Sequence, residues 1–153
     1  MKRRPQKIGW FFFDPKTETV LLHRRDHRAK QSPSMWDCFG GKIEKGEGPE
    51  KAFIRELYEE LGIRIPKDEI ISLIKDKNKY IYYIHFPDWL TGAIRLGEGA
   101  GYAWFSIEDV FKLTGLTDEA CKILSKFEKK VLNSSVKRKC EKRGQVQSIT
   151  KGS

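Results

Sequence analysis

The sequence has few cysteines and histidines, and their arrangement gives no sign of a metal site built from them. Cys38, Cys121 and Cys140 make an odd count without a C-x-x-C pair, so we expect neither a disulfide framework nor a zinc site. The three histidines are scattered without the spacing of metal ligands, and we expect them to be surface or core residues. Zinc-finger and disulfide-rich folds are therefore excluded.

Long apolar runs are also missing. No stretch approaches the roughly 20 residues that a membrane-spanning helix needs, so we expect no contact with a membrane. Basic residues 2–4 and apolar residues 8–13 imitate a secretory signal. The apolar part is too short, however, and Asp14-Pro15 stands where a cleavage site with small residues belongs. These features predict a cytoplasmic protein.

Charges of both signs are plentiful but unevenly distributed. The 153 residues are 39% hydrophobic and 33% charged, which is typical of one globular domain. The net charge of +9 is concentrated at the ends, with +4 in residues 1–7 and +7 in residues 129–153. Apolar periodicity disappears from residue 133 onward. We therefore expect a domain over residues 1–132 and a basic, disordered tail over residues 133–153, with weak nucleic-acid contact by this tail as an open alternative.

The order of β-rich and helical segments favours an α/β fold. Runs of β-branched and aromatic residues predict strands, and apolar residues at helical spacing predict helices. Ser106 and Thr117 are suitable N-caps for the two later helices. The expected strands are 8–14, 19–23, 35–39, 70–75, 79–86 and 102–105, and the expected helices are 49–62 and those that start at Ser106 and Thr117.

Residues 41–63, GKIEKGEGPEKAFIRELYEELGI, combine a glycine-rich segment with a helix. Four glycines between residues 40 and 48 predict a tight loop, because glycine adopts backbone angles that other residues avoid. Pro49 suits a first helical position, and Gly62 suits a C-terminal cap. The sequence therefore predicts a loop that leads directly into a helix.

Three carboxylates share one side of this helix. Glu56, Glu59 and Glu60 are spaced i, i+3, i+4, which places them on one face. Phe53 and Leu57 belong to a separate apolar stripe that can pack on a sheet. Like charges this close repel each other, and a divalent cation removes the conflict; oxygen ligands favour Mg²⁺ or Mn²⁺. A solvated acidic face is the alternative interpretation.

The whole stretch resembles the Nudix box, G-x5-E-x7-R-E-U-x-E-E-x-G-U with U aliphatic, and meets every specified position from Gly41 to Ile63. Chance agreement at seven fixed and two aliphatic positions is expected on the order of once in 10⁸ starts or fewer. The resemblance implies an α/β/α sandwich with a mixed sheet. It also implies a hydrolase that uses Mg²⁺, or Mn²⁺ in its place, to split a nucleoside diphosphate linked to another group.

The resemblance further implies roles for individual residues. The implied metal ligands are the three helix carboxylates and a main-chain carbonyl near the first glycines: Glu56, Glu59, Glu60 and Gly40. Arg55 and Glu47 are expected to form a buried pair that orients this cluster. In related hydrolases a later carboxylate is a further ligand or the general base, and Glu98, between two glycines, is our candidate.

Residues that contact the substrate are expected on both sides of the start of the box. Arg24 and Arg25 lie in a basic segment ahead of it, and Gly41 and Lys42 open it. Guanidinium and ammonium groups at these positions can meet phosphate oxygens, although a solvated basic loop is an equal alternative. The expected partner is a small nucleotide, bound by a monomer or a homodimer.

The box leaves the substrate open. Our first interpretation is nucleoside triphosphates, including oxidised ones. Dinucleoside polyphosphates are an alternative, because Tyr80 stands where such hydrolases often have a tyrosine. A hydrolase of RNA ends is another, with affinity supplied by the basic chain ends. An isomerase of isopentenyl diphosphate is the last alternative, but that family has a cysteine where Phe39 stands, next to Cys38.

Overall fold

Strand β1 (Lys7–Asp14) is the centre of a seven-stranded mixed sheet. The computed structural model describes residues 6–87, 101–133, 138 and 140. β1 runs parallel to β6, with Trp10 opposite Tyr82, and antiparallel to both β2 and β4. The remaining elements are β2 (Thr19–Arg24), β3 (Trp36–Asp37), β4 (Phe39–Lys42), α1 (Pro49–Leu61), the 3-10 turn η1 (Lys67–Glu69), β5 (Ile71–Lys75), β6 (Lys79–His85), β7 (Tyr102–Ser106), α2 (Ile107–Val110) and α3 (Asp118–Lys130).

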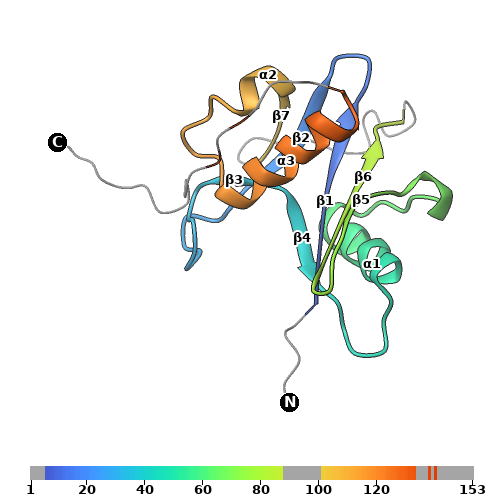
Figure 1. The fold of residues 1–153 in the computed structure, drawn as a ribbon. Coiled ribbons are helices and arrows are strands. Elements are labelled where there is room, and N and C mark those ends of the chain that lie inside the picture. The colour runs from blue at the N-terminus through green and yellow to red at the C-terminus, as the bar shows by residue number, and fades with distance from the viewer. Residues whose placement is uncertain (1–5, 88–100, 134–137, 139, 141–153) are drawn as a thin grey trace.

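Alternate residues of β1 face two separate hydrophobic cores. Trp10 and Phe12 pack with Phe53 and Leu57 of α1 on one side of the sheet. Phe11 and Phe13 pack with α2 and α3 on the other side, as expected from the two-residue period of a strand. The sheet is thus covered on both faces (Figure 1), and the predicted α/β/α sandwich with a mixed sheet is confirmed.

Helix α1 forms where its sequence signals place it. Pro49 is its first residue, and Gly62 caps its C-terminus with a φ of 70°, in the left-handed region that favours glycine. Phe53 contacts Trp10 edge-on at 5.1 Å and stacks on Tyr82 at 5.4 Å between ring centroids. These ring contacts fix the apolar side of the helix against the sheet.

The expectation of a loop at the first glycines of the box region is wrong. Gly40 and Gly41 are not in a loop but in β4, where they pair with Gly9 and Ile8 of β1, because a strand also accepts glycine where another backbone comes close. The predicted strand 35–39 is correspondingly divided into β3 and β4. The glycine-rich turn itself begins only beyond Lys42.

The sequence indicated no disulfide framework, and it gave no sign of the bond that joins Cys121 and Cys140. An odd cysteine count does not exclude one pair when a third cysteine, here Cys38, is buried elsewhere. Arg138 and Cys140 lie in the expected basic tail, yet they contact α3. The division of the chain at residue 132 stays a prediction. In the described part of the chain, no helix is long and apolar enough to cross a bilayer.

Candidate active site

Arg55 connects the glycine-rich turn, strand β4 and helix α1. Its Nε and Nη2 donate to the two carboxylate oxygens of Glu47, at 2.8 and 3.1 Å. Nη2 also donates to the main-chain oxygen of Lys42 at 3.0 Å. This forked hydrogen bond lowers the pKa of Glu47 and raises that of Arg55, so both groups stay charged. The contact predicted between Arg55 and Glu47 is present, with both side chains partly buried.

The same guanidinium group faces two of the three helix carboxylates. Nη1 of Arg55 lies 3.1 Å from Oε2 of Glu56 and 3.2 Å from Oε1 of Glu59. Glu60 instead accepts a hydrogen bond of 3.1 Å from the hydroxyl of Tyr102 on β7. Within the described residues, no three acidic, histidine or cysteine side chains already gather as a metal-binding group. Arg55 therefore offsets the mutual repulsion of Glu56 and Glu59.

Gly41 allows β4 to approach Glu56 closely. A methyl group at Gly41 would lie only 2.5 Å from Oε2 of Glu56, which is far less than van der Waals contact. Glycine at this position therefore makes room for the carboxylate beside the main chain of β4. This places Glu56 against the same short strand that carries Gly40, the residue whose carbonyl the box implies as a ligand.

A cavity of about 300 Å³ lies on the side of the sheet that α3 covers. Its walls come from strands β1, β2, β3, β4 and β6 and from the first turns of α3. Charged and polar lining residues of both signs are Lys7, His23, Arg25, Asp37, Lys42, Lys79 and Glu119. Gly41 also lines it, so β4 is shared by the cavity and by the carboxylates of α1.

Asp37 is the most buried carboxylate of this cavity. Its Oδ1 accepts hydrogen bonds from the hydroxyl of Thr117 at 2.9 Å and from the main-chain N–H of Cys38 at 2.8 Å. Its Oδ2 lies 3.5 Å from Nη1 of Arg25. Burial raises the pKa of Asp37 despite these contacts. Oδ2 has two lone pairs, so it can accept a second hydrogen bond beside the long one from Arg25.

His23 connects the cavity to the helix carboxylates. Its ring stacks on Phe39 at 5.0 Å, and burial lowers its pKa although Asp37 and Glu60 act in the opposite direction. A lowered pKa keeps the imidazole neutral near pH 7. Since the charge of Glu60 acts on the pKa of His23, the acidic face of α1 is close enough to the cavity for electrostatic interaction.

Other predicted contact residues are placed differently. Arg25, Gly41 and Lys42 line the cavity. Arg24 is turned to its own loop, where its Nε donates to the carbonyl of Ser34 at 3.0 Å. This position gives no support to the prediction that Arg24 contacts phosphate. Glu98 lies outside the described residues.

The sequence interpretation missed five charged or polar cavity residues: Lys7, His23, Asp37, Lys79 and Glu119. Lys79 and Glu119 form an ion pair of 3.0 Å across 40 residues of chain, which no local pattern reveals. Asp37 carried one usable signal, because it is an acidic residue in an otherwise apolar strand just ahead of the box. Cys38, also in the wall, is buried, and burial raises its thiol pKa well above the ordinary value.

Comparison with known proteins identifies the relatives of this chain. Residues 3–127 match the family model for the NUDIX domain. The CTP pyrophosphohydrolase of Escherichia coli K12 is 29% identical over 97 residues, covering 61% of this chain and 70% of that protein. The RNA pyrophosphohydrolase of Bartonella quintana is 36% identical over 95 residues, covering 61% of this chain. The match spans only 51% of the length of that relative.

Solved structures show the same fold at low identity. A mutT/nudix family protein from Listeria innocua superposes with a TM-score of 0.68 at 18% identity, covering 87% of this chain and 97% of that one. The MutT protein of Methanosarcina mazei gives a TM-score of 0.55 at 21% identity, covering 84% and 97%. At this level of identity, the superpositions show a shared fold.

Proposed function

The chain belongs to the NUDIX family of hydrolases, and from this premise we propose that it cleaves a phosphoric anhydride bond of a nucleotide with a divalent metal. One observation carries the proposal. Gly41 lines the cavity and is also the point where β4 makes room for Glu56. Because β4 pairs only with β1 among the described strands, it is an edge strand. A nucleotide with its base in the cavity would pass its phosphates around this edge to the carboxylates of α1.

The residues present fit Mg²⁺ by the chemistry of their donors. Glu56, Glu59 and Glu60 supply hard oxygen ligands on one face of a helix, and the carbonyl of Gly40 is the proposed main-chain ligand. A bound metal would neutralise phosphate charge and lower the pKa of the attacking water. Arg55 would hold Glu56 and Glu59 in place through the hydrogen bonds described above, while Glu47 holds Arg55.

The cavity supports a small nucleotide as substrate. Asp37 offers a hydrogen-bond acceptor to a base N–H, and Lys79 and Glu119 offer a donor and an acceptor beside it. Arg25 and Lys42 at the wall have the charge to meet phosphate oxygens. We propose nucleoside triphosphates, including oxidised ones, as the first class of substrate; the name of the E. coli relative agrees with a nucleoside triphosphate.

RNA with a 5′-triphosphate end is the second candidate. It is supported by the relative named RNA pyrophosphohydrolase, which is more identical to this chain than the CTP enzyme is. The only support for dinucleoside polyphosphates as substrates is Tyr80, a residue of β6. For the isomerase alternative, the buried Cys38 thiol, with its raised pKa, would be a poor proton donor.

A phosphate-release screen tests the proposal. The full chain would be incubated with nucleoside di- and triphosphates, oxidised triphosphates, dinucleoside polyphosphates, nucleotide sugars and 5′-triphosphate RNA, each with Mg²⁺ or Mn²⁺. We expect release from nucleoside triphosphates that rises with pH above neutrality, because the attacking water must lose a proton, and that stops in excess EDTA. Undiminished hydrolysis in EDTA would rule the mechanism out, and release from RNA alone would favour the second candidate.

Location and assembly remain proposals as well. We propose a cytoplasmic enzyme that acts as a monomer or a homodimer. The bond between Cys121 and Cys140 is a type of cross-link that is uncommon in reducing compartments except where it is transient or redox-sensing.

A further inference from the structure

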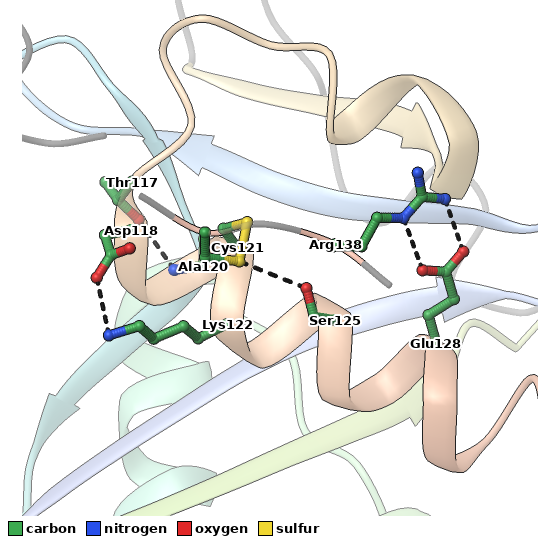
Figure 2. The surroundings of a disulfide bond; sticks show 9 residues. Thr117, Asp118, Ala120, Cys121, Lys122, Ser125, Glu128 and Arg138 are labelled. Atoms are coloured by element: carbon green, nitrogen blue, oxygen red, sulfur yellow. Dashed lines mark hydrogen bonds and ion pairs between the residues drawn. A yellow bond between two sulfur atoms is a disulfide. The ribbon is translucent and has the colours of Figure 1, made fainter. Parts of the chain in front are cut away.

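Two described residues beyond α3 are anchored to that helix. Cys140 is bonded to Cys121, 19 residues earlier, in the first turns of α3. The hydroxyl of Ser125 lies 3.5 Å from the Cys140 sulfur. Figure 2 shows the bond beside the helix, with Arg138 reaching a later turn. We call Arg138 and Cys140 together the C-terminal strap.

The second anchor is a buried ion pair. Arg138 donates to both oxygens of Glu128, at 2.9 and 2.8 Å (Figure 2). Its guanidinium also lies 4.4 Å from the ring centre of Phe111, after α2. Glu128 is only 5% exposed, and a buried carboxylate without a partner is strongly unfavourable. The ion pair therefore requires Arg138 to remain against α3.

The strap holds a helix that forms part of the cavity wall. Glu119 and Ile123 of α3 line the cavity, and Cys121 lies between them in the sequence. Thr117, which caps α3, holds Asp37 through its hydroxyl. A cross-link at Cys121 thus acts on the turns of α3 that line the cavity.

The two sulfur atoms differ in access. Cys121 is fully buried in the core, whereas Cys140 is half-buried. A thiolate from outside therefore reaches Cys140 more easily, and exchange depends on such access. Opening the bond removes one anchor and leaves Arg138 and Glu128 as the other.

We propose that the C-terminal strap is a redox-sensitive clamp on α3 that tightens the substrate cavity when the disulfide is formed. A thiolate of a dithiol reductant attacks the Cys140 sulfur, forming a mixed disulfide while Cys121 leaves and takes up a proton. The second thiol of the reductant then displaces Cys140. The products are two cysteine thiols and one oxidised reductant. The effect on substrate rests on the proposed function, but the clamp itself does not.

Limited trypsin digestion of the full chain, with and without dithiothreitol, tests the clamp directly. Trypsin cleaves after Arg138 only when this side chain leaves Glu128. We expect reductant to speed this cleavage at least ~10-fold and to lower Tm by about 5–10 °C. Cleavage after Lys77, in the turn between β5 and β6, is the internal control and should not change. The variant Cys140→Ser should show fast cleavage and the lower Tm with or without reductant.

Two further measurements test the clamp separately from the proposed catalytic function. Denatured, unreduced protein should titrate one thiol and reduced protein three, since the chain has three cysteines. With nucleotide substrate, reduction should raise KM several-fold and leave kcat unchanged. Three thiols without reductant, or cleavage after Arg138 that ignores reductant, would overturn the clamp. An unchanged KM beside faster cleavage would overturn its link to the cavity, and absence of any hydrolysis would count against the proposed function alone.

Discussion

Gly41 has no side chain where the acidic helix and the sheet come closest. Glu56 occupies the space that a β-carbon would need, and Arg55 holds the same carboxylate from the other direction. The box pattern predicted a glycine here, but it did not predict the reason. The reason is the close approach of β4 to α1, which leaves no space for a β-carbon beside the Glu56 carboxylate.

Changing Gly41→Ala should therefore damage the site more than the fold. The new methyl group would displace the Glu56 carboxylate, so we expect turnover to fall at least ~10-fold while the far-ultraviolet circular dichroism spectrum is retained. The matched control is Gly48→Ala, because a methyl group at Gly48 meets nothing within 4 Å. Equal activity of the two variants would show that the close approach at Gly41 has no role in catalysis.

Asp37 gives a pH dependence whose sign follows from burial. Burial raises its pKa from the ordinary value of 3.8, although the Arg25 and His23 charges oppose this. A raised acid pKa contributes stability that is fully present below pH 3.8 and is lost as pH rises through the folded-state pKa. The variant Asp37→Asn cannot lose this contribution, because its side chain does not titrate.

Urea unfolding of both proteins between about pH 3 and pH 7 measures this effect. The free energy of unfolding of the wild type, minus that of Asp37→Asn, should decrease as pH rises through the window that starts at 3.8. A difference that stays constant or increases would mean that the Asp37 pKa is not raised in the folded protein.

Helix α1 is the element that the sequence predicted most completely. Its first residue, its cap and its two faces all followed from local signals, since helical spacing and capping act within a few residues. Strand β4 was missed because glycines in a strand look the same as glycines in a turn. Its pairing with β1, more than 25 residues earlier, is a tertiary choice.

The apolar side of α1 should determine whether the acidic side is held in place. Leu57 is fully buried against the sheet, so Leu57→Ala should reduce the free energy of unfolding by about 2–5 kcal/mol. Lys51→Ala, on the exposed side of the same helix, should change it by less than about 0.5 kcal/mol. Chemical denaturation of both variants checks this, and similar losses in the two would argue against the described docking of α1.

At the scale of the whole molecule, the cavity could not be predicted because its residues are distant in sequence. Lys7, Asp37, Lys79 and Glu119 come from four separate elements, and only the folded sheet with α3 brings them together. The family pattern, by contrast, is confined to one stretch of 23 residues from Gly41 to Ile63. The acidic face of α1 was therefore predictable, and the cavity was not.

The C-terminal region changes one expectation at this scale. If residues 133–153 formed only the disordered tail that the sequence predicted, deletion after Ser134 would leave thermal stability nearly unchanged. Arg138 and Cys140 instead anchor to Glu128 and Cys121, so that deletion should lower Tm. Charge and disorder signals did not reveal this, since two single residues made the contacts. Nucleic-acid contact by the basic tail stays a prediction.

The central claim is that the three carboxylates of α1 carry a metal-dependent hydrolysis. The most direct test is the Mg²⁺-dependent turnover of Glu59→Gln and Glu60→Gln on the best nucleotide of the screen, with Glu50→Gln on the same helix as control. The Glu50 ion pair with Lys67 is exposed, so its loss should cost little.

We expect turnover to fall at least ~10²-fold in both Glu59→Gln and Glu60→Gln, with unfolding unchanged, because each loses a charge that would stabilise the transition state through the metal. Glu50→Gln should keep nearly full turnover. Near-normal turnover in both Glu59→Gln and Glu60→Gln would contradict the account.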